Sequence, residues 1–139
     1  MRTISLLIIH CSAIKPNQTS SAAQIDQWHR KQGWKCIGYH YVIRRDGSIE
    51  PGRPETMVGA HCHNHNQHSI GICYEGGLDA DGKPSDTRTP EQRASLRALL
   101  VELKHSYPRA LIVGHNVFNP QKSCPCFDAS HEYADLQPK

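Results

Sequence analysis

The chain has 139 residues, of which 37% are hydrophobic and 21% charged, and a formal net charge of +3 at pH 7. This length is typical of one domain that buries its own core, and basic residues without clusters argue against a nucleic-acid-binding surface. No stretch of the sequence approaches the ~20 apolar residues of a membrane span. Ten histidines are more than expected and indicate metal or proton chemistry.

The first apolar segment, residues 4–9, predicts a strand that is buried on both faces. Its six residues are fewer than the roughly 7 to 15 residues in the apolar region of a signal peptide. The segment is followed by His10 and not by the small residues of a cleavage site. We therefore expect no signal peptide. The protein would be made in the cytoplasm and reach any target outside it by another route.

Two segments have the spacing and the caps of helices. Residues 19–33 start with hydroxyl side chains that can cap a helix, have apolar residues at helical spacing and end on Gly33. Residues 89–108 begin with Thr89 as N-cap and Pro90 at the first position, and their leucines form one apolar stripe.

Three further segments predict strands. Residues 38–53 have the pattern of a hairpin with its turn at Asp46 and Gly47, whereas residues 69–77 and 110–118 read as short buried strands. Strands that alternate with helices favour parallel pairing, but a hairpin is antiparallel. The sequence therefore predicts an α/β fold of the α+β type, in which a central mixed sheet is flanked by helices in a single domain, residues 1–139.

Three potential metal ligands follow strands. His10 closes the first strand, His115 closes the last, and Cys124 lies in the loop that follows. Since the first and last strands of such sheets often lie near each other, these side chains can converge at one edge. Three protein ligands and an open fourth position are typical of catalytic zinc, although a single histidine in a sequence is more often structural.

The segment KSCPCFD, residues 122–128, raises the question of what its two cysteines do. By themselves, the two cysteines could be part of a disulfide framework or two ligands of a structural zinc ion. Alternatively, one of them could be a ligand of a catalytic metal and the other have no role in binding it. Several of the six cysteines, such as Cys11 and Cys73, lie in strand-like apolar segments, which favours buried free thiols. Cys11, next to His10 on a strand, should point to the opposite face and pack in the core.

Five segments in this order resemble motifs of one family: IIHCSA, GYHYVIRRDGSIEPGR, GAHCHNHNQHSIGICYEGG, TPEQRASLRALL and GHNVFNPQKSCPCFD. The family is the zinc-dependent type 2 N-acetylmuramoyl-L-alanine amidases, the class of the T7-phage lysozyme, which is related to the peptidoglycan recognition proteins. The resemblance covers about residues 6–128 and leaves 129–139 as a C-terminal tail. It implies the amidase fold, one zinc ion, and a zinc-activated water that cleaves the amide between N-acetylmuramic acid and L-alanine of peptidoglycan.

The resemblance also implies roles for individual residues. His10, His115 and Cys124 match the zinc ligands, and Tyr39 and Lys122 match residues implicated in catalysis. Eight residues separate His115 from Cys124 where the family usually has seven, and we expect the additional residue to be accommodated in the loop before Lys122.

The histidine-rich stretch at 61–68 matches a segment beside the family's active site. His61 is expected to contact the substrate, whereas His63, His65 and His68 are expected to be loop residues rather than ligands of a second metal. The implied partner is peptidoglycan, with no nucleic acid and no membrane insertion, and we expect a monomer. As in a phage endolysin, the site of action would be the cell wall, after release from the cell.

Two other classes of function remain possible at the level of sequence. A peptidoglycan-binding module without hydrolysis would lack the full set of metal ligands, which this chain contains. A cysteine peptidase would use Cys11 or Cys124 with a histidine and no metal.

Overall fold

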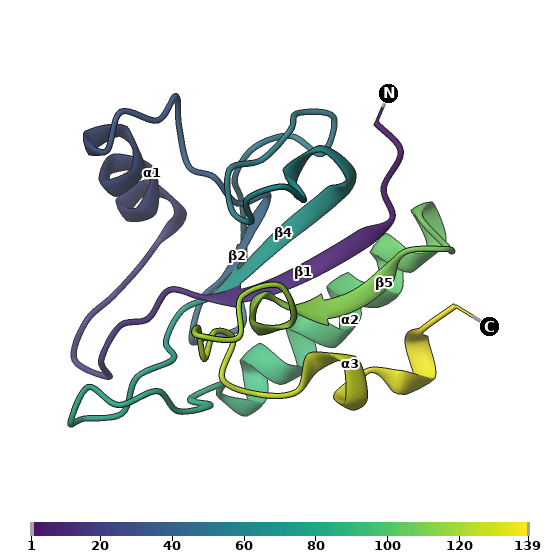
Figure 1. Cartoon of the computed structure of the whole chain (residues 1–139). Coiled ribbons are helices and arrows are strands. Elements are labelled where there is room, and N and C mark those ends of the chain that lie inside the picture. The colour runs from purple at the N-terminus through teal and green to yellow at the C-terminus, as the bar shows by residue number, and fades with distance from the viewer. Residues whose placement is uncertain (1, 139) are drawn as a thin grey trace.

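The computed structural model describes residues 2–138, which fold around one five-stranded sheet with the strand order β3-β2-β4-β1-β5 (Figure 1). The strands and α-helices are β1 (Leu6–Cys11), α1 (Ala22–Lys31), β2 (Tyr41–Ile43), β3 (Ile49–Pro51), β4 (Ser69–Tyr74), α2 (Pro90–Ser106), β5 (Leu111–Gly114) and α3 (Ala129–Glu132). Short 3-10 helices span Asn66–His68, His115–Val117 and Ala134–Leu136. The predicted mixed sheet flanked by helices is confirmed.

The order of the strands brings the first and last strands of the chain together. β1 lies between β4 and β5 and is parallel to both, and β2 is parallel to β4 while β3 forms the antiparallel hairpin. Ile9 of β1 pairs with Gly114 of β5, so the next residues, His10 near the end of β1 and His115 directly after β5, lie close together at the carboxyl ends of the two strands. The prediction that the first and last strands are neighbours is confirmed.

The two faces of the sheet carry separate cores. On one face, Leu7 and Ile9 pack with the leucines of α2, a helix that starts with the predicted N-cap Thr89. On the other face, Leu6 and Ile8 pack with Cys62 and Val113. Since side chains alternate along a strand, His10 has the direction of Leu6 and Ile8, away from α2. Cys11 belongs to the core on the α2 side, as the sequence predicts.

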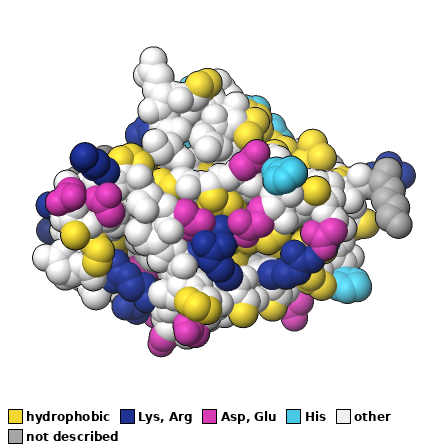
Figure 2. Space-filling view, turned by 90° about the horizontal axis from the view of Figure 1, so that it is seen from below, with side chains coloured by type: hydrophobic (Ala, Val, Ile, Leu, Met, Phe, Trp, Pro, Cys, Tyr) yellow, Lys and Arg dark blue, Asp and Glu magenta, His cyan; other side chains and the backbone are white. Residues whose placement is uncertain are grey.

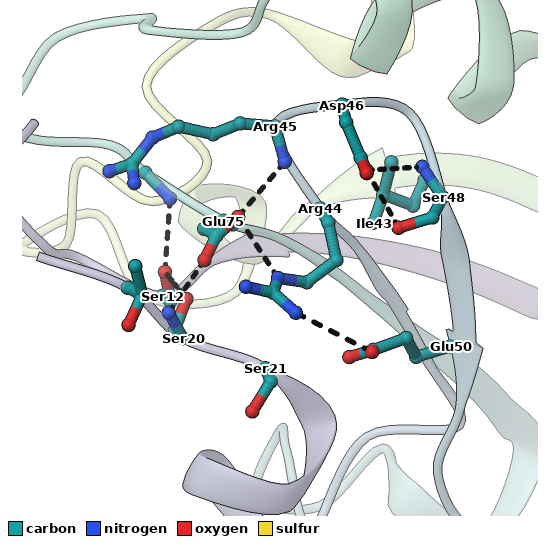
Figure 3. A network of polar contacts seen from close by, with 12 residues as sticks. Ser12, Ser20, Ser21, Ile43, Arg44, Arg45, Asp46, Ser48, Glu50 and Glu75 are labelled. Carbon is teal, nitrogen blue, oxygen red and sulfur yellow. Dashed lines mark hydrogen bonds and ion pairs between the residues drawn. The ribbon is translucent and has the colours of Figure 1, made fainter.

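A polar network holds the hairpin against the end of β4 (Figure 3). The Glu75 carboxylate accepts hydrogen bonds from the backbone N–H groups of Ser20 and Arg45 at 2.7 and 2.9 Å, and from the Arg44 guanidinium at 3.1 Å. Arg44 also pairs with Glu50 of β3 at 3.5 Å. These contacts fix the hairpin and the segment that leads into α1 relative to the edge of the sheet at which β1 ends.

The segment after residue 128 packs against the outer edge of the sheet. Tyr133, which is 2% exposed, belongs to the core on the α2 side. The Gln137 amide donates to the Ile112 carbonyl at 2.8 Å and accepts from the Ile112 N–H at 2.9 Å. The exposed edge of β5 is therefore covered by side-chain hydrogen bonds, and this segment is part of the folded domain.

Arg88 joins the loop before α2 to the C-terminal segment. Its fully buried guanidinium lies 3.4 Å from the centroid of the Phe127 ring and pairs with Asp86 at 2.9 Å and Glu132 at 2.7 Å.

On the face seen in Figure 2, basic and acidic side chains are interspersed with hydrophobic ones. Between residues 2 and 138, none of the helices combines the length and the apolar character that a membrane span requires.

Candidate metal centre

The three ligands expected from the sequence meet at the edge of the sheet where β1 and β5 end. His10 is buried within β1, His115 is half-buried directly after β5, and Cys124 lies in the following loop. Their ligand atoms are all within 4.8 Å of one another, and the rings of His10 and His115 have centroids 4.6 Å apart. Within residues 2–138, this is the one group of three or more His, Cys, Asp or Glu side chains placed to hold a metal.

Backbone contacts hold the loop that carries Cys124. The Asn116 N–H donates to the Cys124 carbonyl at 2.9 Å, and the Tyr74 hydroxyl donates to the Pro125 carbonyl at 2.6 Å. The loop approaches β5 so closely that a Cβ at position 114 would lie 2.7 Å from Pro125 Cδ, which explains Gly114. The Cys11 N–H points at the Cys124 sulfur, 3.0 Å away.

The pKa values of the His10 and His115 imidazoles are lowered, as suits metal ligands. Burial, together with the neighbouring imidazoles, lowers the pKa of His10 well below its ordinary value. Burial, and then the charge of Lys122, lowers the pKa of His115. Since a histidine binds a metal through an unprotonated nitrogen, both side chains are held in the form that ligation requires.

The donor set fits a zinc ion. Two imidazoles and a thiolate are preferred zinc ligands, and three protein ligands leave a fourth position open in a tetrahedral site. The site opens into a cleft of about 430 Å³, lined by His29, Trp34, Tyr39, Ala60, His61, Cys62, His63, Asn66 and His115.

Tyr39 lines this cleft from the segment that leads into β2. Its half-buried ring has its centroid 5.1 Å from that of His10. The Tyr39 carbonyl accepts from the Arg53 N–H at 2.9 Å, and a Cβ at Gly52 would lie 2.2 Å from the same oxygen. Burial raises the pKa of Tyr39 well above its ordinary value, so that its hydroxyl is a hydrogen-bond donor rather than a base.

Lys122 is exposed, near the end of the loop between His115 and Cys124. This loop begins with a 3-10 turn, in which the N–H groups of Phe118 and Asn119 donate hydrogen bonds to the His115 carbonyl at 3.1 and 3.2 Å. A second turn follows, with the Lys122 N–H donating to the Asn119 carbonyl at 2.9 Å. The eight residues are thus folded into consecutive turns, and the ammonium remains near enough to His115 to lower the pKa of its imidazole.

His61 lies behind His10 and is only 9% exposed. Its Nδ1 is 2.9 Å from His10 Nε2, and its Nε2 is 3.2 Å from the Ser69 hydroxyl. His61 is also among the residues that line the cleft, where the sequence predicts that it contacts the substrate. The sequence does not indicate the hydrogen bond to His10 or the part played by Ser69, because neither residue belongs to a local pattern with its partner.

The remaining histidines of the 61–68 stretch lie outside the group of ligands. His63 is exposed, and His65 stacks on Phe118 with a centroid distance of 3.9 Å and contacts His68 at 3.3 Å. Cys126 is also outside the group. Its thiol points to the Gly77 carbonyl at 3.4 Å.

Comparison with known proteins identifies relatives of the whole chain. A family model described as N-acetylmuramoyl-L-alanine amidase matches residues 1–127. The endolysin of Escherichia phage T7 is 47% identical over 122 residues, which cover 88% of this chain and 80% of that protein. The solved structure of the N-acetylmuramoyl-L-alanine amidase LysC from Clostridium intestinale is similar with a TM-score of 0.81 at 31% identity, covering 99% of this chain and 88% of that chain. Drosophila PGRP-LB shares the fold, with a TM-score of 0.75 at 23% identity over 98% of this chain and 81% of that chain.

Proposed function

Because the chain belongs to the N-acetylmuramoyl-L-alanine amidase family and has that enzyme activity, we propose that it performs the hydrolysis with one zinc ion, held by His10, His115 and Cys124. The substrate bond is the amide between N-acetylmuramic acid and the L-alanine of the peptidoglycan stem. The observation that carries this proposal is the convergence of the three ligand atoms within 4.8 Å of one another beside an open cleft.

Amide hydrolysis requires a strong nucleophile at neutral pH and a partner for the charge that develops on the carbonyl oxygen. A bound zinc ion supplies a water of lowered pKa, near 7, and polarises the carbonyl. The chain's own contribution begins with the ligands. The Cys11 N–H orients the Cys124 sulfur at 3.0 Å, and burial keeps the His10 imidazole neutral by lowering its pKa.

Lys122 supplies positive charge at the open side of the site. Its ammonium lowers the pKa of the His115 imidazole, and we assign to it the stabilisation of the carbonyl oxygen as that oxygen becomes negative. One such donor is typically worth about 2.7 to 4 kcal/mol of transition-state stabilisation.

Tyr39, which lines the cleft, supplies a hydrogen-bond donor. Since burial raises the pKa of its hydroxyl, the group stays protonated through the neutral range. We assign to it the orientation of the attacking water or of the substrate carbonyl, at the position where its ring faces His10.

Metal dependence tests this proposal. We expect release of soluble fragments from purified peptidoglycan to stop when a chelator removes the metal and to return when zinc is added. Alkylation of exposed thiols in the zinc-loaded protein should have little effect, since the ligand sulfur is then occupied. Activity that resists the chelator and is abolished by alkylation would instead identify a cysteine peptidase, and binding of peptidoglycan without any release would identify a binding module.

The relatives indicate where the reaction takes place. Since they include phage endolysins, we propose that the protein acts on the cell wall after release from the cell in which it is made.

A further inference from the structure

The ring of His61 is enclosed by backbone. A Cβ at Gly71 would lie 2.6 Å from His61 Cδ2 and Cγ and 2.8 Å from Nδ1, and a Cβ at Gly59 would lie 2.7 Å from Cδ2. Any side chain at either position would collide with the ring. The main chain is held as well, because Asn66 Oδ1 accepts from the N–H groups of His61 and Cys62, both at 2.9 Å.

Both ring nitrogens of His61 have a partner inside the protein. Nδ1 faces His10 Nε2 at 2.9 Å, and Nε2 faces the hydroxyl of Ser69 at 3.2 Å. The enclosure by Gly59 and Gly71 prevents the ring from turning away from these partners. The chain His10, His61 and Ser69 is therefore a fixed series of hydrogen bonds that ends at a metal ligand.

The direction of these hydrogen bonds follows from ligation. Since Nε2 of His10 is engaged by His61, Nδ1 is the nitrogen of His10 left for a metal. The proton of the neutral His10 ring must then be on Nε2, and His61 Nδ1 must be bare to accept it. A neutral His61 consequently carries its own proton on Nε2 and donates it to the Ser69 hydroxyl.

Resting on the zinc site of the proposed function, we propose that His61 is a positioning residue that fixes the tautomer and the orientation of His10 for the metal, with Ser69 fixing the tautomer of His61. Hydrogen bonds of this kind behind a metal-bound histidine typically contribute 10- to 100-fold to metal affinity. The role is distinct from the substrate contact that the sequence predicts.

Zinc affinity separates the two roles. We expect His61→Leu, which removes the acceptor but retains bulk, to weaken zinc binding 10- to 100-fold in a competition titration with a chromophoric chelator. His61→Asn should recover most of this loss, because the amide oxygen of asparagine takes nearly the position of Nδ1. His105→Leu, at an exposed position of α2, is the matched control and should bind zinc as the wild type does. Thermal unfolding of each metal-free variant checks that the fold is retained.

Nitrogen-15 NMR of the zinc-loaded wild type shows directly which ring nitrogen of His10 and of His61 carries the proton. This measurement does not depend on whether the leucine variant folds. We expect the proton of His61 on Nε2 and that of His10 also on Nε2. A His61 ring protonated on Nδ1, or a folded His61→Leu variant with unchanged zinc affinity, overturns the inference while leaving the proposed zinc site intact. A wild-type protein that does not bind zinc overturns both.

Discussion

The backbone N–H of Cys11 donates to the sulfur of Cys124, 3.0 Å away and 113 residues further along the chain. Cys11 directly follows the proposed ligand His10, so one strand presents a histidine to the proposed metal site and a backbone donor to the Cys124 sulfur. Hydrogen bonds from N–H groups stabilise the charged form of an acceptor. The strand β1 therefore contacts two of the three proposed ligands, His10 through its own side chain and Cys124 through a backbone N–H group.

The two cysteines of the KSCPCFD segment should differ in their effect on metal binding. We expect Cys124→Ala to lose stoichiometric zinc after dialysis, because it removes one of three ligands. Cys126→Ala, its matched control two residues away, should retain about one zinc per chain, because this thiol lies outside the group of ligands. The zinc content of both variants can be measured by elemental mass spectrometry. Equal loss in the two variants would show that the ligand assignment is wrong.

Removal of the Lys122 ammonium should slow the reaction without loss of metal. We expect Lys122→Ala to keep its zinc and to lose about 10²- to 10³-fold in kcat, the typical effect of one missing donor to a developing oxyanion. Lys83→Ala, at an exposed position in the loop between β4 and α2, is the control for the change in net charge. An unchanged rate in Lys122→Ala would mean that the longer loop keeps this side chain away from the substrate.

The hydroxyl of Tyr39 should contribute to the rate through one hydrogen bond. We expect Tyr39→Phe to retain zinc and thermal stability but to lose about 10- to 100-fold in kcat, since a hydrogen bond to a charged partner contributes about 1.5 to 3 kcal/mol. Steady-state rates on soluble muropeptides, compared with zinc content, measure this effect. A phenylalanine variant with the rate of the wild type would remove Tyr39 from the mechanism.

The stability of the metal-free protein should fall in acid. Burial lowers the pKa of His10 and His61 in the folded state, whereas in the unfolded chain both titrate near 6.5. Below that pH the unfolded state binds protons that the folded state does not, so stability is present above about pH 6.5 and is lost as the pH falls.

Each histidine that stays neutral should contribute a slope of about 1.4 kcal/mol per pH unit, which for His61 continues toward its folded pKa of about 3. Urea unfolding of the chelator-treated protein at pH 7.5, 6.5 and 5.5 measures this dependence. A free energy of unfolding that stays constant or rises on acidification contradicts the buried, neutral state of the two rings.

The residues after the region of family resemblance should be required for stability. Tyr133 is 2% exposed within the main core, and removal of a large buried aromatic side chain typically costs about 3 to 5 kcal/mol. We expect a loss of that size for Tyr133→Ala in chemical unfolding. Asp135→Ala, at an exposed position in the same segment, should lose less than about 1 kcal/mol. Similar small losses in both would show that the segment is dispensable.

The sequence predicts those parts of the fold that depend on local patterns. The N-cap and the leucine stripe predict α2, and alternation along β1 predicts that His10 and Cys11 face opposite sides of the sheet. The adjacency of β1 and β5 follows from general rules of sheet topology, so the approach of His10 to His115 could also be anticipated.

Other features of the site depend on contacts that leave no pattern in the sequence. The Cys11 N–H is a backbone group, which no residue type reveals. The hydrogen bonds of His61 depend on how the loop before β4 folds over Gly71, and the packing of residues 129–138 depends on single contacts such as those of Gln137 with Ile112. Such non-local contacts become visible only in three dimensions.

Mass spectrometry of purified peptidoglycan digested with the zinc-loaded protein tests the central claim most directly. We predict free stem peptides that begin with the amino group of L-alanine, together with glycan chains that keep intact N-acetylmuramic acid, and no such products after the metal is removed. Fragments cut within the glycan or within the stem peptide, or the same products from the metal-free protein, would contradict a zinc-dependent amidase.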